Sequence, residues 1–483
     1  MINILLPLNK SVPPLYKYYP EFFNNLANCL GEENMNVTIL VFSDLLVNHL
    51  DSFTMIDGEK AQKNKNSVSE LENEYNFSFK QIFNIDLMQT SDFINKTFWR
   101  NIYIPESEFS ENKVHQNKLN QIVELFEKNN YTHVITDQTP DFEQSFIRYL
   151  CNKKNIPFIR YLPNFMTRAY FVSYDNIKDV RIIKAPINQI EDEALSGFLE
   201  NYINGNSPTI FSSINNVFGS IWNFDDYLLP PEPVESLNEP KKSIFEKIKN
   251  KSLNDYYQFF IKHVKRFYID KIESQLKKPY YSSFDKDKKY IYYGLALTVE
   301  SHLALQSFPF LNQINVIETI SRSLPHGYIL YVKPHPWWSS TVSLTDLKKI
   351  SKVPFVKILD PKHKIKKVLK YSRGVVTLNS TSGIEALALG KSVIALAETN
   401  SYADLHPDAS YCANLYDLPG MIVKMVNKSV NKDDTLEYFK KMFSYSSENP
   451  FEADKYISLE DTRKKAKDFS KFIMIVISNF NKK

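Results

Sequence analysis

YILYV at residues 328–332, FVKIL at 355–359, GVVTL at 374–378 and SVIAL at 392–396 are four short, strongly apolar runs of this sequence. Between these runs, apolar residues recur with helical spacing at Lys364–Tyr371 and Gly383–Leu389. The same alternation begins upstream, with an apolar run at Tyr290–Leu297 and a helical pattern at Asn312–Ser323. Strands that alternate with helices in this way predict a parallel sheet with crossover helices.

The N-terminal half shows a similar alternation. We predict strands at four apolar runs: Ile2–Leu6, Asn36–Phe42, Thr132–Thr136 and Pro157–Tyr161. Amphipathic spacing predicts helices at Glu21–Leu30, Lys118–Lys128 and Phe142–Cys151. Asp57–Phe77 is polar without a clear period, which predicts a loop or a weak helix, and Leu459–Asn481 predicts a C-terminal helix. The chain therefore has the pattern of two α/β units.

A connection separates these two units. Residues 206–239 are rich in Pro, Ser, Asn and aromatic side chains, which indicates a boundary. A basic stretch follows: residues 241–289 hold 14 Lys or Arg against 6 Asp or Glu, an excess of +8 in a chain of net charge +4. Five apolar residues of this stretch are spaced to share one helical face: Leu253, Tyr256, Phe260, Val264 and Phe267.

We therefore divide the chain into four parts: an N-terminal α/β domain at 1–225, a linker with the basic helical segment at 226–288, a C-terminal α/β domain at 289–458 and a C-terminal helix at 459–483. Two Rossmann-like domains that face a cleft resemble the two-domain glycosyltransferase architecture called GT-B. In such α/β folds ligands bind at the carboxyl ends of the strands.

Composition excludes several classes of function. The 483 residues include only 11 glycines, and neither G-x-G-x-x-G nor a P-loop motif is present. The three cysteines lie far apart, without zinc-binding spacing or a disulfide framework, which fits a reducing compartment. The first residues lack the features of a signal peptide, and no apolar run reaches the ~18 residues of a membrane span. We therefore expect a cytoplasmic protein without a cofactor.

Lys333-Pro334-His335-Pro336 follows the predicted strand at 328–332 directly. The two prolines restrict the backbone and help to fix the direction of the imidazole. Histidine can hydrogen-bond a phosphate or protonate a leaving phosphate, and Lys333 can add a positive charge. The alternative, a turn histidine satisfied by local partners, stays open.

A second polar motif follows the strand at 374–378. Ser380, Thr381, Ser382 and Gly383 lie where the next helix begins, so they can cap the helix or bind an anion at its positive end. Glu385, in the first helical turn, could hold a ribose hydroxyl or complement the helix dipole. Because both motifs follow strands of one predicted sheet, we expect them at the same edge.

Several carboxylates outside these two motifs have either a chemical or a structural interpretation. Asp137 follows the strand at 132–136 and is our candidate for the base that activates an acceptor hydroxyl, or for the nucleophile of a retaining mechanism. His335 is the other candidate catalytic residue. Asp141 is expected to cap the following helix. Asp285 and Asp287 match the D-x-D pattern of metal-dependent transferases, but their lysine-rich surroundings predict a solvated turn, and we predict no metal site.

The two motifs, K-P-H-P and N-S-T-x-G-x-E-A-L-x-x-G-K-x-V, resemble those of the bacterial capsule polysaccharide biosynthesis proteins, which include the Kdo transferases of capsule assembly. In that family and in the related sialyltransferases, these elements hold the phosphate and ribose of a CMP-activated sugar. The resemblance implies this role for His335, Ser380, Thr381 and Glu385. It also implies a GT-B fold without a bound metal.

The expected function is transfer of a sugar from a nucleotide donor, CMP-Kdo or a related acidic sugar, to a capsule or surface glycan. The alternatives are a CDP-glycerol-type glycerophosphotransferase and a non-catalytic scaffold of polysaccharide assembly. The expected partners are the nucleotide sugar and a glycan or glycolipid acceptor, with no nucleic acid. The basic segment would contact an anionic membrane surface on the inner face of the plasma membrane, or would be an ordinary solvated helix pair.

Overall fold

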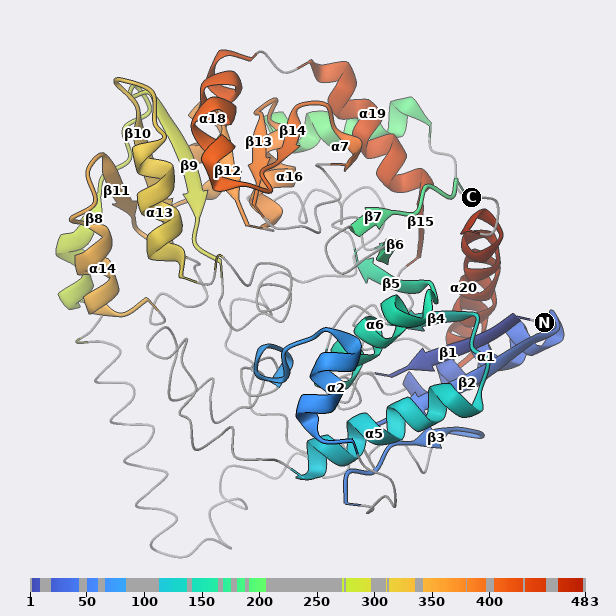
Figure 1. Cartoon of the computed structure of the whole chain (residues 1–483). Coiled ribbons are helices and arrows are strands. Elements are labelled where there is room, and N and C mark those ends of the chain that lie inside the picture. The colour runs from blue at the N-terminus through green and yellow to red at the C-terminus, as the bar shows by residue number, and fades with distance from the viewer. Residues whose placement is uncertain are drawn as a thin grey trace, which may run out of the picture.

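The computed structural model describes residues 2–8, 19–42, 50–59, 66–83, 113–136, 141–163, 168–174, 180–186, 191–205, 272, 275–296, 310, 312–334, 342–378, 380–396, 404–428, 431–448 and 459–480. Two separate sheets organise these residues, one in each half of the chain (Figure 1). The expected α/β class with two Rossmann-like units is thereby confirmed. A cleft between the units stays a prediction.

The first sheet is mixed. Its eight strands are β1 (Ile2–Pro7), β2 (Met35–Val41), β3 (Thr54–Met55), β4 (His133–Thr136), β5 (Phe158–Pro163), β6 (Arg168–Tyr174), β7 (Val180–Ile182) and β15 (Ser446–Glu448). Strands β3-β2-β1-β4-β5 are parallel in that spatial order, and β6 then pairs antiparallel with β5, β7 and β15. The chain reverses its direction across the sheet between β1 and β4, which is where doubly wound folds bind ligands.

Side chains that alternate along β1 serve two cores. Ile4 and Leu6 pack with α1 (Tyr19–Glu32) and α20 (Leu459–Phe480), whereas Leu5 faces the opposite core. Helices α2 (Val68–Tyr75), α5 (Lys113–Lys128) and α6 (Phe142–Lys154) cover that opposite face. The period of two along a strand thus supplies apolar residues to both faces of the sheet.

The second sheet is wholly parallel. Its strands are β8 (Tyr281–Ser282), β9 (Tyr290–Gly294), β10 (Ile329–Lys333), β11 (Val356–Leu359), β12 (Val375–Thr377), β13 (Val393–Ala395) and β14 (Ala409–Tyr411). Their spatial order is β14-β13-β12-β9-β10-β11-β8. From β9 to β14 this is the Rossmann order, with the switch point between β9 and β12.

Helices cover both faces of this second sheet. One face packs against α13 (Gln313–Arg322), α14 (Leu344–Ile350) and α18 (Leu418–Asn427). The other packs against α15 (Ile365–Tyr371), α16 (Thr381–Ala388) and α19 (Lys432–Ser444). Two short 3-10 turns, η3 (Lys278–Tyr280) and η6 (Leu415–Asp417), precede β8 and α18.

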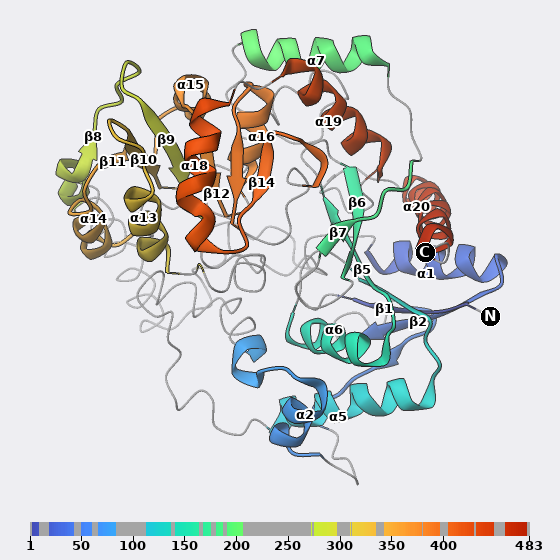
Figure 2. The same cartoon turned by 45° about the horizontal axis from the view of Figure 1, so that its top comes forward.

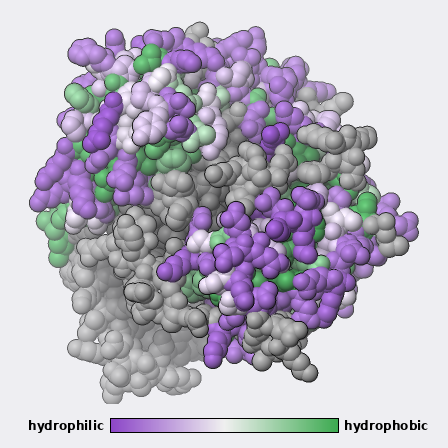
Figure 3. Space-filling view, viewed as in Figure 1, coloured by the Kyte–Doolittle hydropathy of each residue, from purple (hydrophilic) through white to green (hydrophobic). Residues whose placement is uncertain are grey.

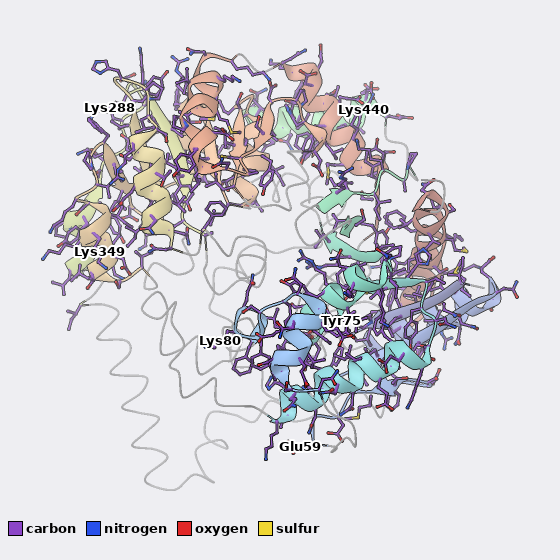
Figure 4. All side chains as sticks on the ribbon, in the orientation of Figure 1. Glu59, Tyr75, Lys80, Lys288, Lys349 and Lys440 are labelled. Atoms are coloured by element: carbon purple, nitrogen blue, oxygen red, sulfur yellow. The ribbon has the colours of Figure 1, made fainter. Side chains whose placement is uncertain are left out.

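Segments of each half cross to the other half. Helix α7 (Asp192–Asn204) follows the first sheet but packs against α16 and α19 of the second unit (Figure 2). An ion pair joins Asp192 of α7 to Lys440 of α19, which Figure 4 labels. In return, β15 joins the first sheet and α20 packs along α1. The two units are therefore tied together by exchanged elements.

Most predicted strands and helices are confirmed, with shifts of a few residues at their ends. Within Asp57–Phe77 the structure has helix α2, because Ser67 and Glu70 form a capping box. The second sheet starts at Tyr281 rather than 289, since β8 pairs with β11. Ser446–Glu448, expected in the C-terminal domain, pairs with β6 of the first sheet.

Most of the predicted linker lies outside the described residues, including the five apolar residues that were expected to share a helical face. In the part of the chain that the structure describes, no helix is both long enough and apolar enough to cross a lipid bilayer.

Candidate functional site

Lys333 is the last residue of β10 and lies at the carboxyl edge of the second sheet. In the register of the sheet it stands opposite Gly294, the last residue of β9. A Cβ added at Gly294 would lie 3.1 Å from the hydroxyl of Tyr292, so the absence of a side chain at Gly294 accommodates that hydroxyl. The Lys333 side chain is 5% exposed in this setting.

Burial and two carboxylates have opposite effects on the pKa of Lys333. Burial lowers its pKa to about 8, and the charges of Asp360 and Glu385 oppose that shift. Asp360 follows β11 and Glu385 belongs to α16, which follows β12. The lysine is therefore within electrostatic reach of groups from both sides of β9, and it carries a positive charge at neutral pH.

The N-terminus of α16 opens at the same edge. Ser380 is its N-cap: the Ser380 Oγ accepts a hydrogen bond from the backbone N–H of Ser382 at 3.2 Å. The backbone N–H of Gly383 donates to the Ser380 carbonyl at 3.0 Å. Thr381, the first helical residue, is exposed. One hydroxyl thus caps the helix and leaves the others for a further role.

Ser382 occupies a different environment from Ser380. It is 2% exposed, and its Oγ has no hydrogen-bond partner among the described residues. A buried hydroxyl without a partner is costly, whereas a helix N-terminus favours an anion through its dipole and free N–H groups. A bound anion at this end of α16 would therefore satisfy both features.

Glu385 is buried one turn further along α16, at 3% exposure. Its charge favours the ammonium forms of Lys333 and Lys366. Burial, and then the Glu385 carboxylate, raises the pKa of both the Tyr202 and Tyr292 hydroxyls. Glu385 therefore lies at the centre of a buried polar cluster. Its interactions extend beyond the helix dipole of α16.

Sequence reasoning missed the contribution of α7 to this cluster. Tyr202 of α7 is fully buried, and the Lys366 Nζ lies 4.9 Å from the centroid of its ring. Lys366 also donates to the Gly205 carbonyl at 2.7 Å. Nothing in the local pattern of α7 indicates this contact, since the residues are more than 160 positions apart. Asp360 could have been found, because it directly follows a predicted strand.

The two proposed catalytic residues, Asp137 and His335, lie outside the described residues. Strand β4 ends just before Asp137, at Thr136, whose hydroxyl donates to the Pro7 carbonyl at 3.3 Å. Asp141 is the N-cap of α6, as predicted, and accepts the Gln144 N–H at 2.8 Å.

Other carboxylates serve the structure. Glu143 is fully buried and pairs with Lys118 at 2.5 Å. Asp285 and Asp287 form the predicted turn, in which the Asp287 N–H donates to the Asp285 Oδ1 at 3.0 Å. Across the residues that the structure describes, no group of three His, Cys, Asp or Glu side chains is placed to hold a metal ion.

Fold and site together define a class: a protein of two Rossmann-type units whose second unit presents a buried lysine, a buried glutamate and a helix N-terminus at the carboxyl edge of its sheet. Such an edge suits a phosphorylated ligand. Residues 236–403 match the model of the family described as capsule polysaccharide biosynthesis protein. The match confirms, for this segment of the chain, the resemblance found in the motifs.

Some solved structures show a distant likeness to much of the chain. The KpsC beta Kdo 2,7 transferase of Thermosulfurimonas dismutans is 12% identical, with a TM-score of 0.32, over 72% of this chain and 89% of that chain. The UDP-GlcNAc 2-epimerase of Methanocaldococcus jannaschii is 10% identical, with a TM-score of 0.26, over 92% of this chain and 100% of that chain. Identities and TM-scores this low indicate nothing about the activity of this chain. No curated protein matches the chain.

Proposed function

We propose that the protein is a glycosyltransferase that moves a sugar from a nucleotide donor to a growing capsule or surface glycan, with CMP-activated Kdo or a related acidic sugar as the donor. The family match over residues 236–403 supports the polysaccharide context. The observation that carries the donor site is the unpartnered, buried Ser382 hydroxyl at the N-terminus of α16, close to the buried Lys333–Glu385 cluster.

In this proposal the donor phosphate lies at the N-terminus of α16. Ser380, Thr381 and the backbone at Gly383 surround it, and the Ser382 hydroxyl donates to a phosphate oxygen. Glu385 accepts a hydrogen bond from a ribose hydroxyl. Each charge-assisted hydrogen bond contributes about 1.5–3 kcal/mol, which is enough for micromolar binding when several act together.

Lys333 supplies positive charge to the departing nucleotide phosphate in the proposed reaction. His335 protonates or hydrogen-bonds that phosphate, and Asp137 accepts the proton of the acceptor hydroxyl. The helix dipole and Lys333 then neutralise the developing charge, so we propose that neither a metal ion nor a cofactor takes part. The free thiols of Cys29, Cys151 and Cys412 support a reducing, cytoplasmic setting.

Isothermal titration with CMP, CDP and UDP tests the proposal. We expect binding selective for CMP, weakened about 10–150-fold in Lys333→Gln because one charge-assisted contact is lost. Affinity of the unchanged protein should also fall as the pH rises through about 8, where the Lys333 ammonium loses its proton. Lys464→Gln, at an exposed position of α20, is the control.

Selective binding of CDP would instead favour the glycerophosphotransferase. Absence of nucleotide binding would favour a scaffold of polysaccharide assembly, and equal affinity of Lys333→Gln and the unchanged protein would remove Lys333 from the site.

A further inference from the structure

The opposite, amino edge of the second sheet carries a row of basic and aromatic residues. In the register of the strands, Arg373 stands beside Lys391, each two positions before its strand, and Lys289 stands beside Tyr328, directly before β9 and β10. Phe355 directly precedes β11 at the end of this row. Backbone hydrogen bonds fix this row, from Arg373 N–H to the Tyr290 carbonyl and from Ile329 N–H to the Lys289 carbonyl, both at 3.0 Å. With about 4.8 Å between strands, the row spans roughly 19 Å.

Phe355 ends this row in an unusual conformation. Its φ of +62° lies in the left-handed region, where the other non-glycine residues of the described chain are all asparagines. Pro354 precedes it, and the Val356 N–H donates to the Val353 carbonyl, so Phe355 takes the turn position that glycine usually fills. Its side chain is nevertheless 67% exposed. Both the conformation and the exposed apolar surface are unfavourable in water.

Four cations lie at or directly beside this edge: Lys288, Lys289, Arg373 and Lys391. Burial and then the Arg373 guanidinium lower the pKa of Lys391, which shows that these two positive charges are neighbours. Lys288, Lys289 and Arg373 are exposed. Within the described ranges none of these four side chains forms an ion pair.

The row faces away from the candidate site. In Figure 1, β9 runs from the outer margin of the molecule toward its middle, and Figure 4 shows Lys288 on that outer margin. Figure 3 shows mainly hydrophilic residues along this margin. Tyr371, two positions before Arg373, adds a second exposed aromatic side chain near the edge.

We propose that this amino edge, defined by Lys288, Lys289, Phe355, Arg373 and Lys391, binds an anionic membrane surface. The cations complement lipid phosphates, and each changes the partition coefficient about fivefold near such a surface. Phe355 enters the boundary between headgroups and acyl chains, where its apolar surface leaves water. A soluble polyanion would satisfy the cations but would offer Phe355 no apolar medium. The proposal is independent of the proposed function.

Co-sedimentation of the full chain with vesicles tests the proposal. We expect binding to phosphatidylcholine vesicles that contain phosphatidylglycerol, none to pure phosphatidylcholine vesicles, and loss at high salt. Lys289→Glu with Arg373→Glu should weaken binding at least about 25-fold. Lys464→Glu with Lys467→Glu on α20 changes the net charge equally at exposed positions and should have a much smaller effect.

Phe355→Gly separates the membrane role from a structural one. Glycine fits the positive φ, so the melting temperature should hold or rise, while vesicle binding falls about tenfold or more. Retention on heparin should stay unchanged in this variant. Unchanged vesicle binding of Phe355→Gly or of the double charge reversal would overturn the proposal, as would retention on heparin without any binding to vesicles.

Discussion

At the scale of single residues, two serines of one turn have different surroundings. The Ser380 Oγ accepts a backbone N–H and caps α16, whereas the Ser382 Oγ is buried without a partner in the described structure. Their identical chemistry makes them a matched pair. Removal of the first hydroxyl should lower stability through the lost cap, whereas removal of the second should act on binding without a loss of stability.

We expect Ser382→Ala to leave the free energy of unfolding unchanged or slightly raised, because a buried, unsatisfied hydroxyl is removed. CMP affinity should fall about 10-fold or more if this hydroxyl donates to the phosphate. Urea unfolding and calorimetry on one preparation measure both quantities.

Ser380→Ala is the matched variant for the measurement of stability. The lost N-cap should lower the free energy of unfolding by about 0.5–2 kcal/mol. A stability loss in Ser382→Ala with intact CMP affinity would refute the assignment of Ser382 to the ligand.

At the scale of elements, a buried histidine connects α16 to α19. The Asp408 N–H donates to the His406 Nδ1 at 3.0 Å, so the Nε2 carries the proton and faces the Thr435 Oγ1 at 3.2 Å. The Thr435 hydroxyl in turn lies 3.3 Å from the Leu387 carbonyl near the end of α16. This chain of hydrogen bonds requires a neutral imidazole and helps to fix the helix whose N-terminus forms the candidate site.

Stability should therefore decline in mild acid. Burial lowers the pKa of His406, while Asp408 and Asp434 oppose the shift and Lys428 and Lys441 add to it. The unfolded chain then binds a proton near pH 6.5 that the folded chain does not, so stability falls as the pH drops below that value. Unfolding at a series of pH values, from about 8 to about 5, measures this slope.

His406→Leu should flatten the slope, at the cost of lower stability at neutral pH because the Asp408 and Thr435 groups lose their partner. His326→Gln, at an exposed position, is the control and should keep the slope. An unchanged slope in His406→Leu would assign the acid sensitivity to other groups.

At the scale of the whole molecule, the C-terminal helix completes the N-terminal unit. Phe469 of α20 is 2% exposed, and its ring lies 5.9 Å from Phe22 of α1 and 5.3 Å from Tyr161 of β5. The first sheet thus depends, for one of its cores, on residues about 300 or more positions away in the chain. An N-terminal fragment that ends at residue 225 lacks this cover.

Phe469→Ala should lower the free energy of unfolding by about 3–5 kcal/mol, because a large buried ring leaves a cavity. Asp468→Ala, which removes only an exposed ion pair with Lys471, should cost at most about 0.5 kcal/mol. Chemical denaturation compares the two variants. Equal stability of both would show that α20 does not support the first sheet.

Local pattern in the sequence determined the strands, the helices and the class of fold. Apolar periodicity depends on neighbours within a few positions, so runs such as Tyr328–Val332 are readable without a structure. The strand-end rule likewise located Lys333 and the turn at Ser380, because carboxyl ends of parallel strands share one edge. Short strands at the edge of a sheet, such as β8 and β15, contain too few residues for an apolar period to predict them.

Only the tertiary structure decided which of these residues meet. The packing of Tyr202 with Lys366, the return of α20 to α1, and the row from Lys391 to Phe355 all join positions that are distant in the chain. Burial then set the chemistry, since desolvation shifts the pKa of Lys333 and leaves the Ser382 hydroxyl without water. Such contacts depend on how the two cores pack against both sheets. The local periodicity of the sequence contains no information about them.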